Sequence, residues 1–217
     1  TFEQLGTTYI KIGQFIASTP SLFPRDYVIA FQGCLDQTTP LPYSYIEQVL
    51  KEELLVEGQS LEDLFSNIDK EPLASASIAQ VHAATLPDGR EVVLKVQKPD
   101  VDVIMQTDLG VLHGITKLME TLMPQMKFAS ISPIIDEIRI RMMAETDFIA
   151  EASNIRDFQQ FLQMTGNAKV VAPEVVDKLT TKRVLTMSRL HGISMVDEVA
   201  MRQYCDDPAQ VMADTLV

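Results

Sequence analysis

The stretch "PLASASIAQVHAATLPDGREVVLKVQKPD", residues 72–100, decides the fold of this chain. Two runs rich in small, β-branched and apolar residues flank Pro87, Asp88 and Gly89, which together are typical of a tight turn. The sequence therefore predicts a β-hairpin over residues 78–97. Lys95 stands near the end of the second apolar run, so the hairpin carries a fixed cation.

Helical patterns precede and follow this hairpin. We predict helices over residues 2–18, 25–36, 43–55, 100–123, 132–164, 194–204 and 207–217. Ser44 and Glu47 have the spacing of a capping box for the third helix, and Ser132 and Pro133 fit the N-cap and first position of the fifth and longest. Two short strands are expected around residues 180–182. This order predicts an α+β fold.

Composition and charge exclude several classes of protein. With 46% hydrophobic residues in 217, the chain has enough apolar material for a substantial core. A net charge of −12 argues against non-specific nucleic-acid binding, which needs clustered Lys and Arg. Two distant cysteines favour a reducing compartment. No apolar window is long enough to predict a membrane span, and the start at Thr1 without a signal peptide suggests an excerpt of something longer.

A lysine fixed on a strand can neutralise the phosphates of a nucleotide when a carboxylate holds it in place. In protein kinases that carboxylate lies on the long helix that follows. The predicted helix over 132–164 offers Glu145, Asp147 and Glu151, of which the last two are four residues apart and share a face. For each charge alone, a solvated strand end or helix face is the simpler interpretation. The order of hairpin, lysine and helix makes a nucleotide-binding role and this simpler interpretation about equally favoured.

Two further segments stand out. In "YIKIGQ", residues 9–14, Lys11 and Gln14 share a helix face, and Gly13 between them indicates close packing against the backbone, because a mid-helix glycine costs about 1 kcal/mol relative to alanine. The alternative is a solvated lysine on an amphipathic helix.

The second segment, residues 74–77, lies where protein kinases carry a glycine-rich loop over the phosphates. It reads Ala74, Ser75, Ala76 and Ser77. Because alanine keeps a Cβ, we expect a loop that approaches phosphates less freely and tunes which nucleotide is held, with the serine hydroxyls as additional donors.

These motifs together resemble the UbiB family of atypical protein-kinase-like proteins, also called the aarF-domain or ADCK family. "KIGQ" matches its KxGQ motif, "ASASIAQVH" its alanine-rich loop, and "ETD" followed by Glu151 its ExD motif and helix glutamate. The likeness continues through "LDQTTPLP", "DGREVVLKVQKP" and "RVLTMSRLHGISM" and spans essentially the whole chain. The chain departs from the family at Ser188, where many members carry an acid, and at "VVLK" in place of the usual "VAVK" or "VAIK".

The resemblance implies a protein-kinase-like N-lobe, a small antiparallel sheet plus a long helix, with a helical N-terminal extension. The implied division is a KxGQ extension over 1–65, the N-lobe with inserted helices over 66–190, and the start of a truncated C-lobe over 191–217. The catalytic loop and the metal-binding aspartates are expected beyond residue 217. No metal ligand is therefore expected in this fragment, which alone would be inactive.

The resemblance also implies roles for single residues. In it, Lys95 contacts the nucleotide phosphates and Glu151 holds it, while Lys11 and Gln14 project into the pocket and obstruct protein substrates. The implied catalytic residues are Lys95, Glu151, Lys11, Gln14, Glu145 and Asp147. The implied nucleotide-binding residues are Lys95, the loop residues Ala74, Ser75, Ala76 and Ser77, and the hinge residues Met187, Ser188, Arg189 and Leu190.

The function that follows by resemblance is ATP or ADP binding with Mg²⁺, and ATP hydrolysis or phosphoryl transfer that supports ubiquinone or other isoprenoid-quinone biosynthesis. Expected partners are prenyl lipids or quinone precursors, quinone-biosynthesis enzymes and a membrane surface, with no nucleic acid. The expected location is the cytoplasm or a membrane: the cytoplasmic face of the inner membrane in a bacterium, an organelle in a eukaryote. A non-catalytic pseudokinase or lipid-binding scaffold of a quinone-biosynthesis complex stays open as the alternative.

Overall fold

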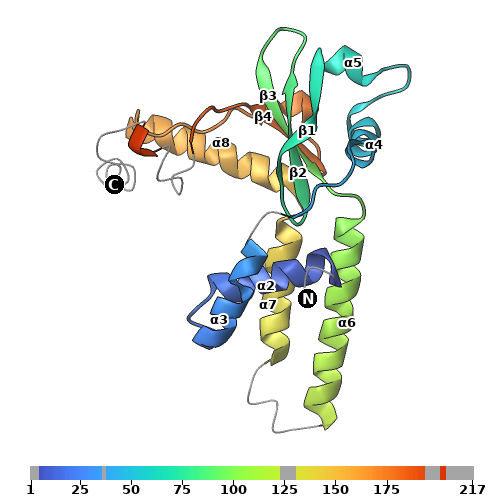
Figure 1. The fold of residues 1–217 in the computed structure, drawn as a ribbon, viewed down its shortest axis with the longest axis vertical. Helices are drawn as coiled ribbons and strands as arrows, with labels where there is room; N and C mark the ends of the chain where they lie inside the picture. The colour runs from blue at the N-terminus through green and yellow to red at the C-terminus, as the bar shows by residue number, and fades with distance from the viewer. Residues whose placement is uncertain (1–4, 36–37, 123–130, 194–200, 204–217) are drawn as a thin grey trace.

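The computed structural model describes residues 5–35, 38–122, 131–193 and 201–203. Its centre is a four-stranded antiparallel sheet in the order β1-β2-β3-β4 (Figure 1). The strands are β1 (Asn67–Ser75), β2 (Ala79–Thr85), β3 (Glu91–Gln97) and β4 (Val184–Ser188). Together with the surrounding helices this sheet makes the fold α+β, as predicted.

The helices form two groups around the sheet. They are α2 (Thr7–Ser18), α3 (Arg25–Phe31), α4 (Tyr43–Leu54), α5 (Leu61–Leu64), α6 (Val101–Leu122), α7 (Ile131–Ala144) and α8 (Phe148–Thr165), with 3₁₀ turns η1 (Gln32–Leu35) and η3 (Asp177–Leu179). Figure 1 shows α4 and α5 beside the sheet on one side and α8 extending from the other. Helices α6 and α7 run side by side away from the sheet; α2 packs across them, and α3 packs on α2.

The predicted hairpin is confirmed. Strands β2 and β3 pair from Ala79 opposite Gln97 to Thr85 opposite Glu91. At the turn between them, Gly89 has a φ of 88°, in the left-handed region that favours glycine. β1 is an edge strand with two register shifts around Pro72, a place where a residue without an N–H is tolerated.

Alternation along the strands divides the core in two. Leu94 and Val96 of β3 lie in one cluster with Ile46 and Leu50 of α4. Side chains on the other face of the sheet, including Leu185 of β4, form a second cluster with α6, α7 and α8. Because successive residues of a strand point to opposite faces, Lys95 and Gln97 face the α8 side of the sheet.

The prediction of a single long helix over 132–164 is wrong. The chain leaves the helix after Ala144 and re-enters it at Phe148, so α7 and α8 are separate. Asp147 is the N-cap of α8, and its side chain accepts hydrogen bonds from the N–H groups of Ile149 and Ala150. The apolar periodicity continues across this break, which is why it did not reveal the cap.

Two predicted caps are also wrong. Helix α4 begins at Tyr43 after Pro42, with no side-chain cap, and Glu47 pairs with Lys51 one turn later. Helix α7 begins at Ile131, so Ser132 is not its N-cap; the buried Ser132 hydroxyl has no hydrogen-bond partner among the described residues.

Of the two strands expected around 180–182, the structure forms one, β4. The segment before it contributes an isolated bridge between Val175 and Met187. The hydroxyl of Thr180 accepts from the Thr186 N–H and that of Thr181 from the Val184 N–H, so side chains replace part of the ladder. The helices predicted over 194–204 and 207–217 lie outside the described residues, except that 201–203 are helical.

A buried polar network lies between β2 and the segment that leads into α4. His82 is fully buried; its Nδ1–H donates to the Asp69 carbonyl at 2.9 Å, and its Nε2 lies 3.3 Å from the Gln80 amide nitrogen, from which it accepts. Gln80 in turn bonds the N–H of Leu41 at 2.6 Å and its carbonyl at 3.3 Å. The network fixes the path of the chain before α4.

This network predicts a pH dependence of stability. Burial lowers the pKa of His82 from its ordinary value of 6.5, so the folded state binds fewer protons than the unfolded state. The stabilisation is present above about pH 6.5 and is lost as the pH falls through the lower folded pKa. We expect the urea midpoint to fall between about pH 7 and 5, and His82→Gln to flatten that fall. His191→Gln, at an exposed position, is the control; equal slopes in the wild type and His82→Gln would contradict the prediction.

Candidate functional site

Lys95 and Glu151 form the centre of the candidate site. The Lys95 Nζ lies 2.7 Å from both carboxylate oxygens of Glu151. The two side chains are 26% and 36% exposed, so the pair is partly desolvated and still reachable by a ligand. The ammonium also lies 4.9 Å from the ring centroid of Phe148, which is fully buried beneath it. The lysine is thereby held by a charge on one side and an aromatic ring on another.

The break between α7 and α8 brings Glu151 to this position. The Phe148 N–H donates to the Lys182 carbonyl at 3.1 Å, and the Asp147 cap starts the helix there, placing Glu151 in its first turn. The buried amide of Gln97 donates to the Thr146 carbonyl at 3.3 Å. β3 therefore holds the start of α8 with both Lys95 and Gln97. Sequence analysis missed Gln97, although its place two residues after Lys95 is the signal that both share a face.

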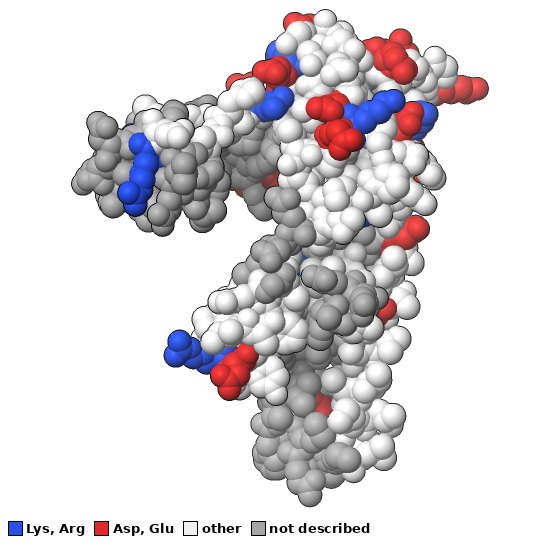
Figure 2. All heavy atoms as spheres, in the orientation of Figure 1, with Lys and Arg blue, Asp and Glu red and all other residues white. Residues whose placement is uncertain are grey.

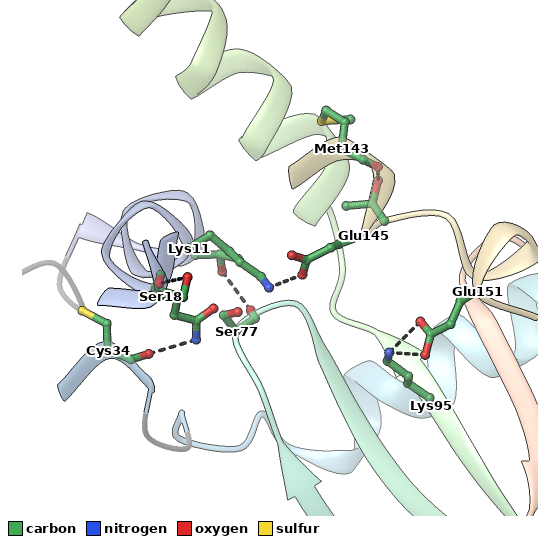
Figure 3. A network of polar contacts seen from close by, with 11 residues as sticks. Lys11, Ser18, Cys34, Ser77, Lys95, Met143, Glu145 and Glu151 are labelled. Carbon is green, nitrogen blue, oxygen red and sulfur yellow. Dashed lines mark hydrogen bonds and ion pairs between the residues drawn. The ribbon is translucent and has the colours of Figure 1, made fainter. Parts of the chain in front are cut away.

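The helical extension reaches the same break. Lys11 of α2 forms an ion pair with Glu145, and Figure 3 shows the two side chains pointing toward each other beside the loop at Ser77. The Lys11 side chain is 15% exposed and that of Glu145 49% exposed. Residues separated by more than half the chain thus meet at the break between α7 and α8, the helix that carries Glu151.

Gln14 is not brought to these residues. Its amide donates to the Cys34 carbonyl at 2.9 Å, so it ties α2 to η1 inside the extension. Gly13 is buried, and a Cβ there would lie 2.6 Å from the Cys34 Sγ and 3.1 Å from Phe31. The predicted close packing at Gly13 is confirmed, and the packing partner is the α3–η1 segment.

The alanine-rich loop joins β1 to β2 and is held by the extension. The Thr38 N–H donates to the Ser75 carbonyl at 3.1 Å, and the Thr38 hydroxyl donates to the Ala76 carbonyl at 2.8 Å. The Thr7 hydroxyl donates to the Ser77 carbonyl at 3.2 Å. Ala74 is half-buried, Ala76 is exposed, and Ser75 and Ser77 are buried, so the serine side chains turn inward.

The hinge residues continue from β4. Met187 pairs with Val93 of β3, and the Ser188 N–H donates to the Glu174 carbonyl at 2.8 Å. The Arg189 N–H donates to the Glu91 carbonyl at 3.1 Å, while Leu190 is 53% exposed. The hinge backbone is therefore hydrogen-bonded to β3 and to the segment before η3 as far as Arg189.

Neither a metal centre nor a membrane span is found in the part of the chain that the structure describes. No group of three or more His, Cys, Asp or Glu side chains there is arranged to hold a metal ion. The Asp147 carboxylate is committed to capping α8. No described helix is both long and apolar enough to cross a membrane.

Known proteins are similar to this chain in sequence and in fold. A family model described as the ABC1 atypical kinase-like domain matches residues 33–216. The chain is 40% identical, over 99% of its length, to an uncharacterized aarF domain-containing protein kinase of Arabidopsis thaliana named as chloroplastic, and 32% identical, over 92%, to a probable protein kinase UbiB of Cellvibrio japonicus. It spans 40% and 35% of those relatives.

A solved structure is similar as well. It is the complex of Rv3197 with erythromycin from Mycobacterium tuberculosis. The match has a TM-score of 0.64 and 28% identity, and it covers 88% of this chain and 48% of the other.

Proposed function

The chain belongs to the ABC1 atypical kinase-like family, the family of UbiB and aarF-domain proteins, and from this premise we propose that it forms the nucleotide-binding part of an ATPase or kinase of that type. ATP or ADP is the proposed ligand. Lys95 would meet the phosphates, Glu151 would hold Lys95, and the alanine-rich loop and the hinge would flank the nucleotide.

The observation that carries the proposal is the bidentate contact between Lys95 and Glu151. Both oxygens lie 2.7 Å from the ammonium, and the buried ring of Phe148 supports it from below. A lysine on a sheet strand, paired with a helix glutamate, positions nucleotide phosphates in protein kinases. Because Lys95 stays 26% exposed, a phosphate oxygen can reach it while Glu151 keeps it in place.

When bound, Mg²⁺ would supply positive charge that neutralises the nucleotide phosphates. The described residues do not supply its ligand set: Asp147 caps α8 and Glu145 pairs with Lys11. The chain's own contribution is therefore to bind and orient the phosphates. The metal ligands and the catalytic base are proposed for the other part of a longer protein, in keeping with relatives of which this chain spans about two fifths.

Glu151→Gln tests the proposal in the full-length protein. The amide keeps the shape but loses the charge that holds Lys95, so we expect ATP and ADP affinity, measured by isothermal titration calorimetry, to fall about tenfold. Glu62→Gln on α5, an exposed acid away from the site, is the matched control. Unchanged affinity in Glu151→Gln, or no nucleotide binding by the wild type, would overturn the proposed function.

The wider role rests on the relatives. One relative is named UbiB, and we propose a role in ubiquinone or related isoprenoid-quinone biosynthesis, with prenyl lipids or biosynthetic enzymes as partners at a membrane surface. The chloroplastic name of the plant relative supports an organellar location if the source is a eukaryote.

A non-catalytic binding module is the second candidate, and one observation favours it. On the face drawn in Figure 2, charged side chains gather over the sheet, whereas few are seen along α6. One side of α6 leaves several apolar side chains exposed, namely Ile104, Val111, Ile115, Leu118 and Leu122. A module of this kind would retain its activity in cells when nucleotide binding is removed by mutation, whereas an ATPase or kinase would lose it.

A further inference from the structure

We propose that Thr38 and Lys98 form a latch that holds the segment Ser75–Ile78 of the alanine-rich loop by its carbonyl groups. In this proposal the latch also sets the preference of the site between ATP and ADP. The second half of the proposal rests on the proposed nucleotide-binding function. The first half concerns the loop alone. Thr38 and Lys98 act through the loop, so they are positioning residues.

The latch is built from contacts on both sides of the Thr38 hydroxyl. The Lys98 ammonium donates to the Thr38 Oγ1 at 3.0 Å, and the Thr38 hydroxyl donates to the Ala76 carbonyl at 2.8 Å. An ammonium has donors and no acceptor, so it can only use the oxygen lone pair of the threonine. The hydroxyl proton is thereby directed to the loop. Lys98 is 8% exposed, so water competes little for this contact.

Lys98 also holds the end of the loop through its backbone. Its N–H donates to the Ile78 carbonyl at 2.8 Å. Lys98 follows β3 directly and lies three positions after Lys95, so the alternation of side chains places the two on opposite faces. The Lys98 ammonium therefore reaches Thr38 on the face of the sheet away from Lys95. Burial lowers the pKa of Lys98.

The consequence is a fixed orientation of the loop peptides. The carbonyls of Ser75, Ala76 and Ser77 are all bonded to Thr38 or Thr7 of the extension. In a trans peptide the N–H points opposite to the C=O, so the N–H groups of Ser77 and Ile78 are directed away from the extension. Backbone N–H groups in such a loop are the donors that a phosphate oxygen accepts.

Fixing these donors decides which phosphates they can reach. A glycine-rich loop moves to follow the terminal phosphate, whereas a loop held by three carbonyls keeps one position. ATP and ADP differ by that terminal phosphate. Releasing the latch is therefore expected to change the affinity for ATP relative to ADP.

The test uses four variants of the full-length protein. Thr38→Val and a double variant release the latch, and Thr38→Ser and Thr39→Val are the controls. Thr38→Val removes the hydroxyl and keeps the β-branch and the N–H, and Thr38→Ser restores the hydroxyl. Thr39→Val makes the same change at the next residue, which is exposed. Thr38→Val combined with Lys98→Met removes the ammonium that Thr38→Val leaves without its hydroxyl partner.

Hydrogen–deuterium exchange of residues 76–79 decides the first half. We expect exchange to rise about three- to tenfold in Thr38→Val, with wild-type rates in Thr38→Ser and Thr39→Val. The double variant should recover overall stability toward that of the wild type and keep the fast loop exchange, which a purely structural role would not produce. Equal loop exchange in Thr38→Val and Thr39→Val would overturn the latch.

Calorimetric titration with ATP and with ADP decides the second half. We expect the ratio of the two dissociation constants to shift about three- to tenfold in Thr38→Val and in the double variant, and to stay unchanged in both controls. A faster-exchanging loop with an unchanged ratio would overturn the link to nucleotide preference. If the wild type binds neither nucleotide, the proposed function fails, and the exchange result still decides whether the latch exists.

Discussion

Replacing Lys95 with methionine is expected to weaken ATP binding by about 10- to 100-fold while the chain remains folded. A hydrogen bond to a charged group contributes about 1.5–3 kcal/mol, and methionine keeps the apolar stem of lysine without its charge. Removing the ammonium also leaves Glu151, whose carboxylate it contacts at 2.7 Å, facing the incoming phosphates. Repulsion between the freed carboxylate and the nucleotide adds to the loss. Isothermal titration calorimetry measures the affinity, and circular dichroism checks the fold.

Lys51→Met is the matched control for this substitution. Lys51 lies on α4, on the other side of the sheet, and pairs with Glu47 one turn away. The loss at Lys95 is specific only if Lys51→Met binds ATP as the wild type does. ATP affinity within twofold of the wild type in Lys95→Met would show that the phosphates do not lie at this lysine.

The largest effect on stability is expected at Phe148. Its side chain is fully buried at the first position of α8, within the core cluster shared by α6, α7 and β4. Truncating a buried phenylalanine to alanine costs about 3–5 kcal/mol, because apolar contacts are lost and a cavity remains. Phe148→Ala should lower the free energy of unfolding by that amount, measured by urea denaturation. It should also weaken ATP binding, because Lys95 loses the ring 4.9 Å beneath it.

Phe158→Ala is the control on the same helix. Phe158 is 45% exposed and stacks on Phe161, so its truncation should cost less than about 1 kcal/mol. If Phe148→Ala does not fold, the free energy of unfolding is measured for Phe148→Leu, for which we expect an intermediate loss. Equal midpoints for Phe148→Ala and Phe158→Ala would contradict the role of Phe148 as the support of the site.

Local signals predicted the hairpin well. Gly89 at a positive φ and two β-rich runs are properties of neighbouring residues, and these residues pair as expected. The separation of α7 from α8 was missed because the local signals conflict. Helical periodicity crosses residues 145–147, whereas the Asp147 cap is stabilised by hydrogen bonds that form only once the chain has turned. Pinning of Thr146 by Gln97 and of Phe148 by the Lys182 carbonyl makes the turn favourable.

The candidate site likewise combines features that motifs identify with contacts that depend on distant residues. The family resemblance identified Lys95, Glu151, Lys11 and Glu145 and implied that Glu151 holds Lys95, a pair that the structure contains. It did not imply a partner for Lys11 or for Gln14. The structure pairs Lys95 with Glu151 and Lys11 with Glu145, and directs Gln14 to Cys34 instead. Thr38, Gln97 and Lys98 lie in stretches that resemble the family, but no role was predicted for them, since each acts on a group far away in the chain. Thr38 donates to the Ala76 carbonyl, Gln97 to the Thr146 carbonyl and Lys98 to the Thr38 hydroxyl.

The sequence by itself determined the α+β class, the hairpin and the residue types of the site, because turn chemistry and side-chain alternation depend on neighbours a few residues apart. Only the tertiary structure decided that Lys11 pairs with Glu145, that Gln14 turns to Cys34, and how the alanine-rich loop is oriented. Those contacts join residues that lie 20 to 134 positions apart, so packing of the helices on the two faces of the sheet sets their partners. The loop without glycines is thus held in place by the helical extension as well as by its own residues.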